Sequence, residues 1–115
     1  MDVADNKYFY YKVAEVGELS ENGRLLVEIY GLAIVIIRTN NTYFALGDIC
    51  THDGGPLGEG ELIDCQIVCP RHGARFDLQT GKALTLPAVE DTPSYPVIIK
   101  DGTIEVGIPV EKLND

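Results

Sequence analysis

Residues 48–81, with the sequence DICTHDGGPLGEGELIDCQIVCPRHGARFDLQTG, carry two short Cys/His pairs in a turn-rich part of the chain. The first pair is Cys50 and His52, and the second is Cys69 and His72. Residues this close in sequence lie on single loops, so two such loops can hold one object between them. Glycines follow each pair, and they let the backbone approach that object without a Cβ clash and with its N–H groups free.

The two pairs contain both histidines of the chain and two of its three cysteines, which predicts a metal site. Zinc fingers usually supply a cysteine pair and then a histidine pair, and a Cys₂His₂ set can hold tetrahedral zinc. Here each loop brings one cysteine and one histidine instead. That arrangement favours a two-iron site, in which both thiolates bind one iron and both imidazoles bind the other. A zinc-stabilised binding module is the less favoured alternative.

The overall composition predicts one small globular domain over residues 1–115. The formal net charge is −9, from 18 acidic and 9 basic residues. Nucleic-acid binding needs clustered Lys and Arg, so this charge argues against it. The same charge favours solubility and attraction to a protein partner with a basic face.

The N-terminal segment suggests neither export nor membrane insertion. It has no basic region followed by an apolar stretch, so a signal peptide is not expected. The longest apolar run, residues 32–37, is far shorter than the roughly 20 residues that span a bilayer. An odd number of cysteines cannot form a closed disulfide framework. We therefore expect no membrane association and a cytoplasmic location.

Strand-like composition dominates the rest of the chain. The predicted strands cover residues 8–13, 24–30, 32–38, 42–46, 62–63, 66–68, 95–100 and 103–108. Asn40-Asn41 and Asp101-Gly102 favour tight hairpins, and residues 13–19 fit one helical turn at most. Short strands with many turn signals predict an all-β, antiparallel sandwich or barrel. Residues 86–94 read as a surface loop, either a simple connection or a functional lid.

The two pairs and their surroundings resemble the Rieske family. Its two boxes run C-x-H-x-G-x-x-L and C-P-x-H-G-x-x-F, followed by an Asp and a Thr-Gly turn. The chain supplies the matching Cys50, His52, Gly54, Leu57, Cys69, Pro70, His72, Gly73, Phe76, Asp77, Thr80 and Gly81. The resemblance implies a Rieske-like fold with a cluster-binding subdomain of two loops, at about residues 48–81, and one [2Fe–2S] cluster. It also implies that Cys50 and Cys69 bind an inner iron and that His52 and His72 bind an outer iron.

Four departures from the high-potential members of that family are informative. Gly55 and Arg71 stand where those proteins have disulfide-forming cysteines, and Ala74 and Phe76 replace a serine and a tyrosine. The missing hydroxyls would otherwise stabilise the reduced cluster through hydrogen bonds. The resemblance therefore implies a reduction potential at the low end of the Rieske range, about −150 mV.

The resemblance implies a soluble carrier that takes one electron from a flavoprotein reductase to a terminal oxygenase or another oxidoreductase. Family members of this size commonly serve aromatic-ring dioxygenases. A 2-His-1-carboxylate iron site would need two more histidines than the chain has, so we expect no enzyme activity from the chain alone. An accessory Rieske subunit bound permanently in a larger oxidoreductase is the main alternative.

Several further residues lie near the two loops. Cys65 is expected to be a small buried apolar residue rather than a ligand. Pro87 falls where the family has a proline-containing loop that shields the cluster. The charged neighbours of the loops are solvated surface residues or docking contacts: Asp48, Asp53, Asp64, Arg71 and Arg75.

Overall fold

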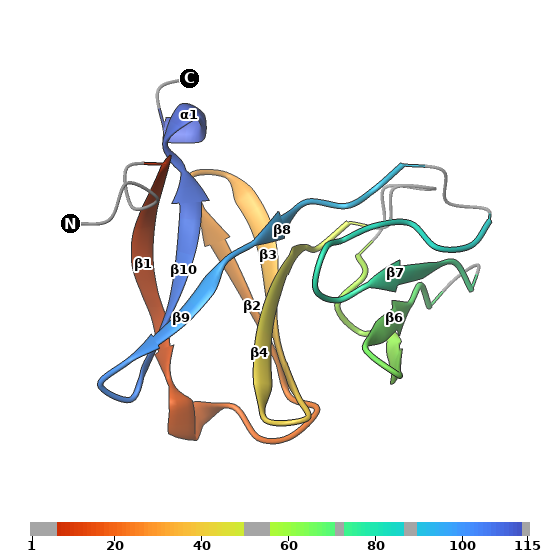
Figure 1. Cartoon of the computed structure of the whole chain (residues 1–115), viewed down its shortest axis with the longest axis horizontal. Helices are drawn as coiled ribbons and strands as arrows, with labels where there is room; N and C mark the ends of the chain where they lie inside the picture. The colour runs from red at the N-terminus through yellow and green to blue at the C-terminus, as the bar shows by residue number, and fades with distance from the viewer. Residues whose placement is uncertain (1–6, 50–55, 71–72, 87–89, 114–115) are drawn as a thin grey trace.

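The computed structural model describes residues 7–49, 56–70, 73–86 and 90–113 (Figure 1). Most of this part of the chain is β-strand. The strands are β1 (Tyr8–Glu15), β2 (Arg24–Ile29), β3 (Leu32–Thr39), β4 (Thr42–Gly47), β5 (Glu61–Ile63), β6 (Gln66–Val68), β7 (Arg75–Asp77), β8 (Ser94–Tyr95), β9 (Val97–Lys100) and β10 (Thr103–Pro109). Within the described ranges, the helical elements are one 3₁₀ turn, Val16–Glu18, and one short helix, α1 (Val110–Leu113).

These strands form three sheets, and every pairing is antiparallel. The end sheet has the order β1-β10-β9, the central sheet β2-β3-β4-β8, and the small sheet β5-β6-β7. In Figure 1 the end sheet and the small sheet lie on opposite sides of the central one. The predicted all-β antiparallel fold is confirmed.

Strand β3 explains why the central sheet lies in the middle. Its run of apolar residues is buried on both faces, as expected for a strand without a solvent-facing side. Ile34 and Ile36 pack with residues of the end sheet, whereas Val35 and Ile37 pack with residues of the small sheet. One strand therefore anchors two hydrophobic cores, and the second core supports the predicted metal site.

Two-residue turns with positive φ at both positions connect four hairpins. They are Tyr30-Gly31, Asn40-Asn41, Asp64-Cys65 and Asp101-Gly102. Such turns match the right-handed twist of the strands that they join. The two hairpins predicted from the Asn-Asn and Asp-Gly pairs are confirmed.

The strand predictions fail where the structure depends on pairing between residues that are far apart in the sequence. Residues 95–100 form no single strand, because Pro96 separates β8, which pairs with β4, from β9, which pairs with β10. Proline has no N–H to continue a ladder, although its carbonyl accepts a hydrogen bond from Gly107 at 2.9 Å. Strand β7 and helix α1 were not predicted.

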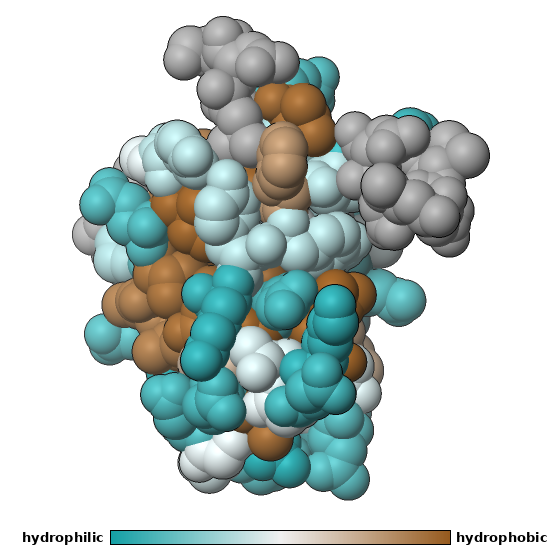
Figure 2. All heavy atoms as spheres, turned by 90° about the vertical axis from the view of Figure 1, so that its left-hand side faces the viewer, coloured by the Kyte–Doolittle hydropathy of each residue, from teal (hydrophilic) through white to brown (hydrophobic). Residues whose placement is uncertain are grey.

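The face that carries β1 lies on the side of the molecule away from the small sheet. Figure 2 shows apolar patches on this face among charged and polar side chains. Here β1 and β2 are the edge strands of different sheets, and a shallow groove between them is lined by residues that include Tyr11, Val27 and Tyr30. The rings of Tyr11 and Tyr30 meet edge to face, with centroids 5.9 Å apart.

Candidate metal centre

One of the four predicted ligands, Cys69, lies within the described residues. Cys50, His52 and His72 lie outside them, as do Asp53, Gly55, Arg71 and Pro87. The part of the site that the structure describes is therefore Cys69, together with the segments that enter and leave each loop.

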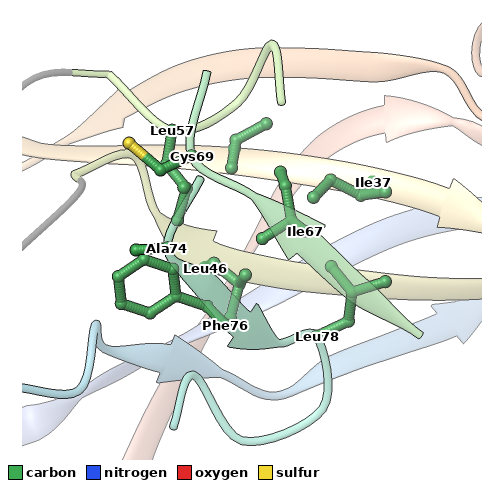
Figure 3. Close-up of a cluster of buried hydrophobic side chains, with 9 residues drawn as sticks. Ile37, Leu46, Leu57, Ile67, Cys69, Ala74, Phe76 and Leu78 are labelled. Carbon is green, nitrogen blue, oxygen red and sulfur yellow. The ribbon is translucent and has the colours of Figure 1, made fainter. Parts of the chain in front are cut away.

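Cys69 follows β6 directly and is 2% exposed. It belongs to the core cluster that also contains Leu57, Ala74 and Phe76. Figure 3 shows its sulfur at the rim of this cluster, directed away from Ile67. A thiol placed in this way can bind a metal while apolar side chains keep water from one side of it.

The second loop is closed by two backbone hydrogen bonds. The N–H of Cys69 donates to the carbonyl of Ala74 at 2.7 Å, and the N–H of Gly73 donates to the carbonyl of Cys69 at 3.0 Å. Gly73 has a φ of +75°, a conformation that glycine adopts without strain. Because β6 and β7 pair on either side, with Val68 opposite Arg75, the ends of this loop are fixed.

The first loop is tied at its base by Asp48. One oxygen of its carboxylate, Oδ1, accepts hydrogen bonds from the N–H groups of Leu57, at 3.0 Å, and Gly58, at 2.7 Å. Leu57 is fully buried in the same cluster as Cys69. The end of the first loop therefore packs close to the cysteine of the second loop, as a shared metal site requires.

The Asp and Thr-Gly positions after the second loop form a tight turn. Oδ1 of Asp77 accepts hydrogen bonds from the N–H groups of Gln79, at 2.8 Å, and Thr80, at 3.0 Å. The N–H of Gly81 donates to the carbonyl of Asp77 at 2.8 Å. These motif residues hold the backbone, so their contribution to the site is structural.

We expect Asp77→Ala to lower the free energy of unfolding by about 1–3 kcal/mol, because two backbone N–H groups lose their acceptor. Urea denaturation of the purified variant measures this change. Gln79→Ala is the matched control, since it alters an exposed side chain in the same turn. Equal stability of the Asp77 variant and the wild type would contradict this role.

Thr92 is a structural residue that the sequence did not reveal. Its side chain is buried, and its hydroxyl donates to the carbonyl of Gly47 at 3.2 Å. Its N–H donates to the carbonyl of Gly81 at 2.8 Å. Thr92 therefore joins the segment after residue 90 to both the central sheet and the Asp77 turn. Nothing in the sequence around Thr92 signals such a role.

Ala74 and Phe76 are both fully buried beside Cys69 in the core cluster. Neither side chain carries a hydroxyl group. The two hydroxyl donors of the high-potential proteins are therefore replaced here by apolar groups that are packed into the core.

The expectation that Cys65 is buried is wrong. The structure places this cysteine, as an exposed free thiol, at the second position of the turn between β5 and β6, with a φ of +62°. Its carbonyl accepts a hydrogen bond from the N–H of Leu78 at 2.9 Å. In strand β6, which follows this turn, Ile67 is the side chain that faces the core.

Three of the charged neighbours now have defined surroundings. Asp48 ties the base of the first loop, so it is more than a surface acid. Asp64 is exposed in the β5–β6 turn. Arg75 is half-buried, and its Nη1 donates to Oε1 of Gln66 at 3.4 Å.

Within the described residues, no group of three or more His, Cys, Asp or Glu side chains is arranged to hold a metal ion. Nor does this part of the chain form a helix that is long and apolar enough to cross a membrane.

Comparisons with known proteins agree with this geometry. The Rieske [2Fe-2S] domain model matches residues 9–96. The ferredoxin subunit of 3-phenylpropionate/cinnamic acid dioxygenase from Photorhabdus laumondii is 40% identical over 101 residues, which cover 87% of this chain and 95% of that protein.

Two solved structures extend the similarity to the fold. The ferredoxin of carbazole 1,9a-dioxygenase from Nocardioides aromaticivorans IC177 superposes with a TM-score of 0.80 at 26% identity, over 84% of this chain and 95% of its own. A ferredoxin chain in the complex of reduced oxygenase and oxidized ferredoxin in carbazole 1,9a-dioxygenase gives 0.78 at 28% identity, over 84% and 91%.

The family match identifies an iron–sulfur cluster as the metal centre, in place of the zinc ion considered as an alternative. The donor set of two cysteines and two histidines is the one that a Rieske cluster requires, and the buried Cys69 fits the position of a thiolate ligand. This chain belongs to the Rieske [2Fe–2S] domain family, and its cofactor is one [2Fe–2S] cluster.

Proposed function

We propose that this chain is the ferredoxin component of an aromatic-ring dioxygenase system. It takes one electron from a flavoprotein reductase and delivers it to a terminal oxygenase. The observation that carries the proposal is the alignment with a dioxygenase ferredoxin subunit over 87% of this chain and 95% of that protein. The structural similarity to carbazole dioxygenase ferredoxins supports the same role.

In this proposal Cys50 and Cys69 hold the inner iron, and His52 and His72 hold the outer iron. The cluster, when bound, accepts and releases one electron. Support for the assignment comes from the buried thiol of Cys69, from the closed turn that follows it, and from the Asp48 contacts at the base of the first loop. The chain's own residues keep the two loops in place and shield Cys69 from water.

The proposed reduction potential is at the low end of the Rieske range, about −150 mV. The reduced cluster carries one more negative charge than the oxidised cluster, so hydrogen-bond donors favour reduction. Ala74 and Phe76 supply no side-chain donors near Cys69. A redox titration that gave a potential above zero would contradict this part of the proposal.

We propose that the chain is an electron carrier and not an enzyme by itself. Both of its histidines are assigned to the cluster, and a 2-His-1-carboxylate iron site for oxygen chemistry would need two more. The net charge of −9 favours protein partners with a basic docking face. We also propose that residues 1–115 form one Rieske domain; its cytoplasmic location stays a prediction.

Reconstitution with purified components tests the function. The chain is mixed with NADH and the flavoprotein reductase of a 3-phenylpropionate dioxygenase system, and its visible absorbance is followed. We expect bleaching of the cluster by the reductase, and reoxidation when the terminal oxygenase, substrate and oxygen are added. No reduction by the reductase, or hydroxylation of the aromatic substrate without the oxygenase, would contradict the proposal.

His72→Cys tests the ligand assignment. A thiolate in place of an imidazole makes the cluster more negative, so its potential should move from about −150 mV toward the about −400 mV of all-cysteine ferredoxins. Redox titration monitored by EPR measures the shift. Cys65→Ser is the matched control, because that cysteine is exposed and lies outside the proposed site. A potential that His72→Cys leaves unchanged would exclude His72 as a ligand.

A further inference from the structure

The segment Leu57–Gly60 connects the first cluster loop to β5, and two charged side chains hold it from one side. Asp48 follows β4, and Arg24 begins β2, so both belong to the central sheet or its direct extension. Asp48 binds N–H groups of the segment, whereas Arg24 binds its carbonyl groups. Opposite charges therefore hold the two kinds of backbone group.

Asp48 is well placed to fix the beginning of this segment. Its backbone N–H donates to the carbonyl of Ala33 on β3 at 2.9 Å, which anchors Asp48 to the central sheet. Its Oδ1 is shared by the N–H groups of Leu57 and Gly58. Hydrogen bonds to an ionised acceptor are about twice as strong as those between neutral groups.

Arg24 fixes the remainder of the segment. Its Nη1 donates to the carbonyls of Gly58, at 2.5 Å, and Gly60, at 2.8 Å, while its Nε donates to the carbonyl of Asn22 at 3.1 Å. Burial lowers the pKa of the Arg24 guanidinium, and the nearby Glu59 partly offsets this effect. An arginine remains protonated in spite of such a change, so the donor is permanent.

Two glycines bring the segment against both its neighbours. A Cβ on Gly58 would lie 3.0 Å from Oδ1 of Asp48 and 3.0 Å from a methyl group of Val35 on β3. A Cβ on Gly60 would overlap the carbonyl oxygen of Val68, the last residue of β6. Val68 immediately precedes Cys69. The segment therefore touches the central sheet on one side and the entry to the second cluster loop on the other.

We propose that Asp48 and Arg24 are positioning residues that set the separation of the two cluster-binding loops through the segment Leu57–Gly60. The first loop ends at this segment, and the strand that leads to Cys69 packs against it. Loss of either side chain lets one loop move relative to the other and changes the geometry of the ligands. The inference rests on the ligand set proposed above.

The test compares Arg24→Met and Asp48→Asn with Arg38→Met. Arg38 on β3 is the matched control, since its Nη1 also donates to a loop carbonyl, that of Leu19, at 2.8 Å, but on the loop between the 3₁₀ turn and β2. One sample of each holo-protein is reduced for EPR. A second, oxidised sample is exposed to an iron chelator, and the loss of its visible absorbance is timed.

We expect Arg24→Met and Asp48→Asn to lose the cluster at least about tenfold faster than wild type, a change on the order of the 10–100-fold loss of metal affinity caused by removing a group that orients a ligand. Their EPR line shapes should also change. Arg38→Met should lower Tm yet keep the wild-type line shape. If Arg24→Met does not fold, Arg24→Lys replaces it and should show a smaller change in the same direction.

Two different failures are distinguishable. If the three variants keep the wild-type line shape and lose the cluster in proportion to their loss of Tm, Asp48 and Arg24 act only on stability and the inference is wrong. If the wild-type spectrum itself indicates all-cysteine ligation, the ligand proposal fails first, and the inference falls with it.

Discussion

A Cys69→Ala variant will be isolated without its cluster. Cys69 is the proposed ligand that lies within the described residues, its thiol is buried, and alanine offers no atom that can bind iron. The inner iron would keep only one of its two proposed thiolate ligands. This incomplete ligand set does not hold a [2Fe–2S] cluster. Iron analysis should fall from two atoms per chain to none, and the visible absorbance should disappear.

The same substitution should destabilise the fold, because metal binding contributes free energy to folding in small domains. Cys69 lies in the core that joins the small sheet to β3. Loss of the cluster should therefore first weaken the packing between this sheet and β3. Cys65→Ala is the control, and it should keep two iron atoms per chain, since its thiol is exposed in a turn. A Cys69→Ala protein that retained its iron would refute the site.

Gly81→Ala will be among the most destabilising single substitutions in the chain. Gly81 has a φ of +77°, and a Cβ there would overlap the carbonyl oxygen of Thr92. The left-handed conformation costs a non-glycine residue about 1–2 kcal/mol. Overpacking against backbone adds about 1–3 kcal/mol. The sum is a large part of the about 5–15 kcal/mol that stabilises a typical domain.

Chemical denaturation of the holo-protein measures this loss. Gly17→Ala is the control, because Gly17 has no positive φ and, apart from its own neighbours in the chain, no atom lies within 4 Å of the added methyl group. Its free energy of unfolding should stay within about 0.5 kcal/mol of wild type. Equal stability of Gly81→Ala and Gly17→Ala would mean that the Thr92 contact does not constrain the turn.

Local sequence signals predicted most of the large sheets. The unbroken apolar run in β3 fits a strand buried on both faces, and Asn40-Asn41 and Asp101-Gly102 adopt the positive φ angles that tight hairpins need. These features depend on neighbours in the sequence, so they are readable without the structure. The same holds for the Cys/His pairs, whose spacing identified the family.

Features that depend on distant residues could not be predicted. Strand β7 has three residues and exists because β6 offers it an edge. Pro96 divides residues 95–100 between two sheets because each half meets a different partner. Arg24 contacts Gly58 across 34 positions of sequence. Cys65, expected to be buried, is exposed because it lies in the two-residue turn between β5 and β6.

EPR spectroscopy of the dithionite-reduced protein tests whether two cysteines and two histidines hold one [2Fe–2S] cluster. We expect a rhombic spectrum that integrates to one spin per chain, with an average g value clearly below that of all-cysteine [2Fe–2S] ferredoxins. A spectrum with the average g value of all-cysteine clusters, or no signal from an iron-loaded protein, would contradict it.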